Sequence, residues 1–171
     1  MPSGFPPDPA TANPDIVGLG ADPAHPWGRD PATGNPLTAE EWRQRYIDPN
    51  GKPRWPPNAG AVPGSRHTFT SLDDFRAAYG SDVDRIGEPD GEYLGIPPGS
   101  AWGQRGLQPG SMSSKLHGYE LTGDLPRGWH IEVSTIAEAF GQPGGGIQAV
   151  VLDETGTLVL VEDLIERGVL Q

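Results

Sequence analysis

Hydrophobic residues occur in short, separated runs along the second half of the chain. Trp129, Ile131 and Val133 alternate with polar residues, and this period of two is typical of a strand with one buried face. Turn residues separate the runs, and Asp153 to Gly156 predicts a hairpin between the last two. The segments predicted as strands are 83–86, 116–121, 129–136, 147–152 and 157–161.

Helical signals are fewer and lie at the ends of these runs. Thr38 to Glu41 and Ser71 to Asp74 match capping boxes, which predict one helix through about Tyr46 and a second that ends at Gly80. Glu162 to Arg167 predicts a last helix. Strands dominate and no strand–helix–strand crossover pattern occurs, so we predict an α+β fold with a central, mainly antiparallel sheet flanked by short helices.

The N-terminal part differs in composition. Residues 1–36 contain nine prolines and no hydrophobic period, which predicts a Pro/Gly-rich arm or linker that is dispensable for activity. Residues 37–66 predict a short helix and turns that pack on the core, and residues 67–171 predict the core itself. A chain of 171 residues fits one domain of this kind.

Charge and composition exclude several classes of function. The net charge of −11 disfavours nucleic acids and anionic membranes, since both are bound through clusters of Lys and Arg. The chain has no cysteine, which excludes thiolate chemistry and disulfides. No apolar stretch reaches the roughly 18 residues that membrane insertion requires. The N-terminus lacks the pattern of a signal peptide, so export would depend on a longer polypeptide.

The most unusual segment is a glycine run, Gly144 to Gly146, between Gln142 and Gln148. Consecutive glycines allow a ligand to approach the backbone and expose N–H groups to it, and they are equally consistent with a flexible loop between two strands. The segment is not a Walker loop, because no Gly-Lys-Ser/Thr follows it. The flanking amides favour the ligand-binding interpretation.

Candidate polar side chains are scattered between the predicted strands. Arg85 and Arg105 are suited to phosphates, although the acidic neighbours of Arg85 favour a salt bridge to Asp84 or Glu88 when this segment is taken alone. His117 lies on a predicted strand, where a lone histidine more often has a structural role than a catalytic one. No cluster of His, Asp and Glu has metal-ligand spacing, which predicts no metal site. There is also no Glu-x-Glu pair and no Gly-x-Ser-x-Gly elbow.

Taken in order, several of these segments resemble the tuberculosis necrotizing toxin family, whose members are C-terminal domains of mycobacterial outer-membrane channel proteins. The resemblance covers residues 67–171, and the run from Phe140 to Gln148 is its most specific part. The other matching segments are Asp84 to Gly87, Gly91 to Leu94, Arg105, Lys115 to Tyr119 and Val161 to Ile165.

The resemblance implies a toxin that hydrolyses NAD to nicotinamide and ADP-ribose, depletes host-cell NAD and kills the cell. It implies a fold related to ADP-ribosyltransferases, no cofactor or metal, and an immunity protein that blocks the site. NAD is the expected substrate, with NADP left open as a second one. The domain would be secreted or displayed at the cell surface within a larger exported polypeptide, and would act in the host cytosol.

The resemblance also assigns residues. It implies that His117, Gln148 and Tyr93 are catalytic, and that Arg85, Arg105 and Tyr93 bind the substrate together with the glycine run Gly144, Gly145 and Gly146. Two alternatives remain open. An ADP-ribosyltransferase toxin that modifies a host protein is disfavoured by the missing Glu-x-Glu pair, and a non-enzymatic Pro-rich binding module is disfavoured by the lack of a repeated Pro-x-x-Pro core.

Overall fold

A computed structural model describes residues 11–171, which form a six-stranded sheet in the order β1-β5-β6-β3-β2-β4. Each neighbouring pair in this order is antiparallel. The predicted α+β fold with a mainly antiparallel sheet is therefore confirmed, while the relation to ADP-ribosyltransferases stays a prediction. The strands are β1 (His67–Phe69), β2 (Asp82–Ile86), β3 (Leu94–Ile96), β4 (Leu116–Glu120), β5 (His130–Thr135) and β6 (Ile147–Leu152).

Four of the five predicted strands occur close to their predicted bounds, and one does not. The segment 157–161 makes only an isolated bridge between Leu152 and Leu158, and at Val161 the chain already enters a helix. That strand prediction is wrong: Val159 and Val161 pack in the core, but the segment does not extend the ladder beyond this bridge. Strands β1 and β3 were not predicted, since three residues are too few to show a period.

The helices begin and end where the capping residues predict. Thr38 and Glu41 form a complete capping box at α2 (Ala39–Tyr46), and Ser71 caps α3 (Leu72–Tyr79) through its side chain. Gly80 ends α3 at a φ of 83°, which favours glycine. The last helix, α4, spans Val161–Glu166. Short unpredicted helices are α1 (Pro14–Val17), η2 (Asn58–Gly60), η3 (Trp102–Arg105) and η4 (Pro109–Ser113).

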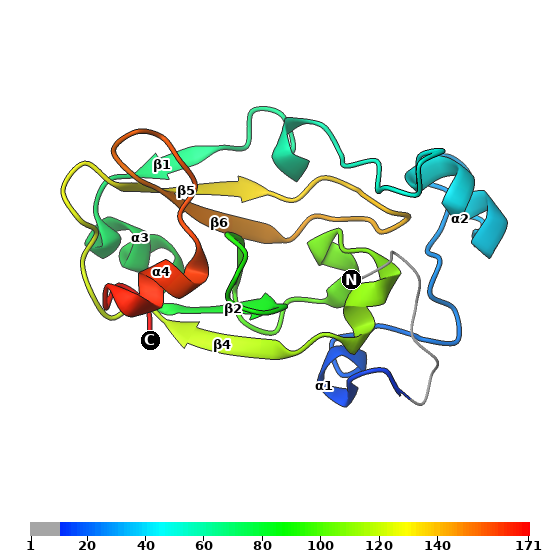
Figure 1. Cartoon of the computed structure of the whole chain (residues 1–171), viewed down its shortest axis with the longest axis horizontal. Helices are drawn as coiled ribbons and strands as arrows, with labels where there is room; N and C mark the ends of the chain where they lie inside the picture. Colours follow the sequence, from blue (N-terminus) through cyan, green and yellow to red (C-terminus); the bar gives the residue numbers. More distant parts are fainter. Residues whose placement is uncertain (1–10) are drawn as a thin grey trace.

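The main hydrophobic core lies between the sheet and the pair α3 and α4 at one end of the molecule (left in Figure 1). Phe75 of α3 and Leu164 of α4 are fully buried in it, together with Val83 of β2 and Ile131 of β5. Helix α2 lies at the opposite end (Figure 1), where Trp42 packs against Phe140 in a separate aromatic cluster. No helix among residues 11–171 has the length and apolar character needed to cross a membrane.

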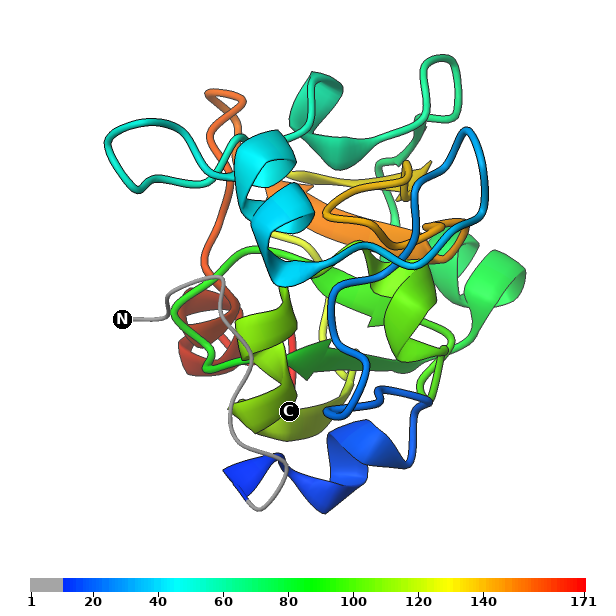
Figure 2. The same ribbon diagram turned by 90° about the vertical axis from the view of Figure 1, so that its right-hand side faces the viewer.

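The arm or linker predicted for residues 1–36 does not describe residues 11–36, and residues 1–10 lie outside the described part. Ile16 is completely buried in a second cluster with Trp102 and Met112. The Asn13 side chain donates to the Ser114 carbonyl at 2.8 Å. Figure 2 shows this segment, in blue, running along the molecule from α1 toward α2. The apolar residues of this segment are irregularly spaced and join different clusters, Ile16 and Ala21 one and Trp27 another. The sequence therefore shows no period although the segment is packed.

Candidate functional site

A cleft of about 560 Å³ brings together four of the residues that the sequence singled out. Arg85, Tyr93, Arg105 and Gln148 line it. These side chains come from β2, the start of β3, η3 and β6, which are neighbours in the fold although they are distant in the sequence. The volume is within the range of about 300–1,000 Å³ that is usual for small-molecule sites.

The strand register sets the orientation of Gln148. Gly95 of β3 is paired with Gln148 on one side and with Asp84 on the other, so these three positions share one face of the sheet. The Gln148 Nε2 donates to the Ser134 Oγ at 3.1 Å, and Ser134 is buried. This bond fixes the amide, and the Gln148 Oε1 is left without a partner among residues 11–171. The amide is therefore held ready to accept a hydrogen bond from a ligand.

Arg105 makes a buried ion pair with Asp84. Its Nη1 and Nη2 donate to the two carboxylate oxygens at 2.7 and 2.9 Å, and its Nε donates to the Ser100 carbonyl at 3.1 Å. The two side chains are 7% and 3% exposed. Gly95 makes the pair possible, because a Cβ there would lie 2.7 Å from the carboxylate and 2.9 Å from the guanidinium. Asp84 thus neutralises the charge that was predicted to bind phosphate.

Arg85 keeps its charge uncompensated. Its Nε donates to the Glu88 carbonyl at 2.7 Å and its Nη1 to the Tyr93 carbonyl at 3.0 Å, so it ties β2 to the turn that precedes β3. The alternative salt bridges to Asp84 or Glu88 do not form: Asp84 pairs with Arg105, and Glu88 accepts through its backbone. Arg85 is one position from Asp84, so its side chain starts on the sheet face opposite Gln148, but the residue still lines the cleft. Because residues 11–171 contain no ion pair to it, Arg85 is the cation at the edge of the cleft that can attract an anion.

Tyr93 contributes a neutral phenol. Partial burial is the main cause that raises its pKa above the ordinary value of 10.0, and the nearby carboxylate of Glu92 raises it further. A raised pKa means that the hydroxyl stays protonated throughout the neutral range and remains both a donor and an acceptor. Tyr93 can therefore hydrogen-bond a ligand or pack its ring against it without a change in charge.

His117 lies beside the cleft rather than in its lining. His117 of β4 is paired with Arg85 of β2 in the sheet, and this pair is next to the pair of Asp84 with Gly118. Because side chains alternate along a strand, the His117 side chain starts on the face of the sheet opposite Gln148, and His117 does not line the cleft. Its ring stacks on Tyr119 at 6.1 Å, and its Nε2 lies 3.9 Å from the Glu88 carboxylate. That nitrogen is buried without a hydrogen-bond partner among residues 11–171. The structure thus separates His117 from Gln148, and the predicted catalytic role stays a prediction.

The glycine run has a structural explanation that differs from the predicted one. The N–H groups of Gly144, Gly145 and Gly146 donate to the carbonyls of Gly103, Ile136 and Gln104 at 3.1, 2.8 and 3.1 Å. They are not free for a ligand, and the run does not line the cleft. Glycine is required because a Cβ at Gly144 would lie 2.5 Å from a backbone carbonyl. The run therefore clamps η3 to the end of β5, and the expectation of exposed N–H groups is wrong.

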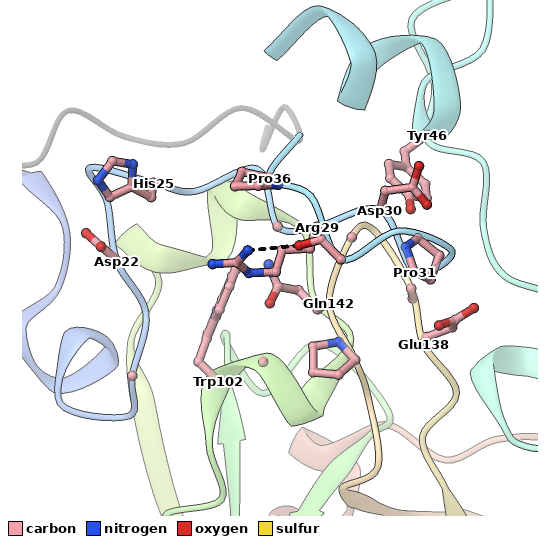
Figure 3. Close-up of a pocket in the computed structure, with 17 residues that line it drawn as sticks. Asp22, His25, Arg29, Asp30, Pro31, Pro36, Tyr46, Trp102, Glu138 and Gln142 are labelled. Carbon is pink, nitrogen blue, oxygen red and sulfur yellow. Dashed lines mark hydrogen bonds between the residues drawn. The ribbon is translucent and has the colours of Figure 1, made fainter. Parts of the chain in front are cut away.

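A larger cavity of about 1,020 Å³ lies between residues 20–36 and the loop before β6 (Figure 3). The side chains of Arg29 and Gln142 face each other in it, whereas none of the predicted substrate-binding residues lines it. Within its described lining, the carboxylates of Asp22, Asp30 and Glu138 outnumber the guanidinium of Arg29. Asp30 is paired with Arg45 at 2.9 Å, which leaves Asp22 and Glu138 against Arg29. The remaining charge balance still disfavours an anionic ligand, so we place the candidate site in the smaller cleft.

Sequence reasoning missed three residues: one that lines the cleft, Trp55, and two that hold the side chains of its lining, Asp84 and Ser134. Asp84 was considered only as a partner of its neighbour Arg85, and Ser134 carried no motif. Trp55 was not singled out as a site residue within the segment 37–66, which was predicted only to pack on the core; it is 71% exposed and lines the cleft. The prolines next to Trp55 were the sequence signal that could have identified it, because they restrict the backbone beside its exposed ring. Among residues 11–171, no group of three or more His, Asp or Glu side chains could hold a metal ion.

Comparison with known proteins agrees with the resemblance seen in the sequence. The family model described as tuberculosis necrotizing toxin matches residues 77–171, which is more than half of the chain. The outer membrane channel protein CpnT of Mycobacterium tuberculosis and that of Mycobacterium bovis are each 42% identical over 173 residues, covering 97% of this chain. The similarity extends far into the N-terminal third, so the interpretation that it begins at residue 67 is too narrow. The chain spans about 20% of the length of these relatives.

A solved structure gives the same result. The tuberculosis necrotizing toxin complexed with its immunity factor IFT superimposes with a TM-score of 0.87 and 39% sequence identity, over 100% of this chain and 94% of that one. Fold, sequence and family model thus agree, and this chain belongs to the tuberculosis necrotizing toxin family.

Proposed function

We propose that this toxin domain hydrolyses NAD to nicotinamide and ADP-ribose in the cleft between β2, β3 and β6. The observation that carries the proposal is one cleft lined by the oriented amide of Gln148, by the neutral phenol of Tyr93 and, from the adjacent strand position, by Arg85, which forms no ion pair among residues 11–171. A cation for the diphosphate, an acceptor for a ribose hydroxyl and an aromatic ring are the groups that a dinucleotide requires.

The chemistry of NAD explains why so few groups suffice. Its nicotinamide already carries a positive charge and leaves as a neutral ring, so the leaving group needs no proton, unlike that of an ordinary glycoside. The protein has to hold the ribose while positive charge develops on it, and to admit one water. The Gln148 Oε1 can accept from a ribose hydroxyl, and Tyr93 can pack against the nicotinamide riboside. In this proposal Arg85 holds the diphosphate and Arg105 shapes the wall of the cleft through Asp84.

The biological setting is part of the same proposal. The CpnT relatives are outer membrane channel proteins, so the domain would be exported within a larger polypeptide and act in the host cytosol, where loss of NAD kills the cell. The similar toxin structure contains an immunity factor, and a cognate immunity protein would cover the cleft here as well. NADP remains open as a second substrate.

Product analysis tests the proposal against an ADP-ribosyltransferase. Purified protein is incubated with NAD, alone and with host-cell extract, and nicotinamide and free ADP-ribose are quantified by chromatography. A hydrolase releases both products in equal amounts without extract. Nicotinamide release that requires extract and leaves labelled ADP-ribose on host proteins would instead establish a transferase.

A further inference from the structure

Trp55 is exposed at the cleft although tryptophan is the residue with most to gain from burial. Of the five tryptophans, which all lie within residues 11–171, Trp55 alone is exposed, at 71%. Trp42, Trp102 and Trp129 are between 0 and 9% exposed. An exposed indole that lines a cavity leaves a large flat apolar surface in contact with water, and such a surface is available for a planar ligand.

The indole is held in place by its surroundings. The Arg54 N–H donates to the Tyr46 carbonyl at 2.8 Å, which fixes the chain directly before Trp55 to the end of α2. Pro56 and Pro57 follow and restrict the backbone after it. The ring meets Phe140 edge-on, with 5.7 Å between centroids and an interplanar angle of 87°.

Phe140 is itself rigidly placed. It is 3% exposed, and its carbonyl accepts from the Trp42 Nε1 at 2.9 Å. An indole that packs against a fixed ring and sits in a restrained backbone loses little freedom when a second ring stacks on it, so stacking there costs little entropy.

We infer that Trp55 stacks on the adenine of the bound dinucleotide, the base that is not cleaved. The inference rests on the proposed function and adds the position of the second base. The reacting end of NAD requires the inner polar groups, and the Gln148 amide is held by the buried Ser134. Trp55 remains largely open to solvent in the same cleft, so it is available to the distal end of the ligand. Every base has a face that an indole can stack on, and adenine offers the larger one.

Three measurements on Trp55→Ala test the inference, with Trp55→Phe as the conservative variant. Leu158→Ala is the matched control, because Leu158 is also an exposed large apolar residue, at 39%, and does not line the cleft. The measurements are calorimetric titration with ADP-ribose, the KM and kcat for NAD, and the Ki of nicotinamide mononucleotide, which lacks the adenylate half. Thermal unfolding confirms that each variant is folded.

We expect Trp55→Ala to weaken ADP-ribose binding and raise the KM for NAD by roughly 5- to 100-fold, the range that corresponds to one base stacked on an aromatic ring. The kcat and the Ki of nicotinamide mononucleotide should stay within about twofold, Trp55→Phe should recover part of the affinity, and Leu158→Ala should behave as the unmodified protein. Stacking contributes equally to ground and transition states, so it acts on KM rather than on kcat.

Other outcomes overturn the inference. An equal loss for ADP-ribose and nicotinamide mononucleotide would place Trp55 at the nicotinamide end, and unchanged ADP-ribose affinity would remove it from the site. Both results would leave NAD hydrolysis by the unmodified protein intact, so the proposed function would survive. Conversely, ADP-ribose binding that depends on Trp55 in a protein that does not cleave NAD would refute the proposed function and leave the adenine contact standing.

Discussion

Replacing Arg105 with alanine should destabilise the fold, because Arg105 is the buried ion-pair partner of Asp84 rather than a direct ligand of the substrate. In Arg105→Ala the carboxylate of Asp84, 3% exposed, would lose both guanidinium bonds and keep only the Gly99 N–H at 2.8 Å. A buried charge left without its partner costs about 3–5 kcal/mol. For a protein of this size, a loss of 1 kcal/mol lowers the Tm by roughly 2–4 °C. We therefore expect the Tm to fall by roughly 6–20 °C.

A double-mutant cycle separates the ion pair from the packing of the two side chains. Asp84→Asn should also destabilise the protein, because it leaves the guanidinium buried against a neutral amide. The double variant Arg105→Ala, Asp84→Asn removes both charges, so its loss should be smaller than the sum of the single losses, with a coupling on the order of 1–3 kcal/mol. Urea unfolding followed by tryptophan fluorescence measures the free energy of unfolding of each variant.

The same variants show whether Arg105 binds substrate. If Arg105 shapes the cleft through Asp84, activity of the folded fraction should fall in Asp84→Asn as well as in Arg105→Ala. The reasoning is refuted if Arg105→Ala unfolds within about 0.5 kcal/mol of the unmodified protein while its affinity for ADP-ribose collapses. That result would make Arg105 a direct ligand of the diphosphate, with Asp84 only a neighbour.

Three further predictions concern other parts of the chain. Ile16→Ala should cost about 2–5 kcal/mol of unfolding free energy, because Ile16 is completely buried, whereas its 42% exposed neighbour in Val17→Ala should cost under about 0.5 kcal/mol by the same urea titration. Gly144→Ala should lower the Tm more than Gly145→Ala, since a Cβ at the former meets a carbonyl at 2.5 Å and at the latter only the positive φ of 92° is strained. The catalytic role that the resemblance implies for His117 predicts that His117→Asn leaves the Tm nearly unchanged, because the buried Nε2 has no hydrogen bond to lose among residues 11–171, and lowers NAD hydrolysis by roughly 10²–10⁴-fold although His117 does not line the cleft. A parallel fall of Tm and activity would assign a structural role, and unchanged activity would remove His117 from the reaction.

Local rules predicted the elements that local chemistry controls. The capping box at Thr38 and the helix end at Gly80 depend on residues within one or two turns, and both were predicted correctly. The strand β3 could not be predicted, because its three residues are specified by pairing with β2 and β6. The same limit applies to residues 11–36, where Asn13 finds its partner 101 positions away at Ser114.

In the candidate site, too, the sequence identifies residues but not the contacts between residues that are distant in the chain. Four of the residues that the resemblance identified line one cleft, whereas His117 and the glycine run do not, and a residue list does not show what holds each side chain. Arg85 and Arg105 look equivalent in the sequence, and only the fold reveals that Asp84 neutralises Arg105 and leaves Arg85 uncompensated. Conversely, the glycine run looked like a ligand loop because glycine permits close approach, and the group that approaches is the protein's own backbone.

The central claim is that NAD is cleaved in the cleft that contains Gln148. The most direct measurement is the initial rate of nicotinamide release from NAD by the unmodified protein and by Gln148→Ala, compared at equal folded concentration. We expect steady release by the unmodified protein and a rate at least about 100-fold lower for the variant, since the amide oriented by Ser134 would be lost. Equal rates for the two proteins, or no release by the unmodified one, would contradict the account.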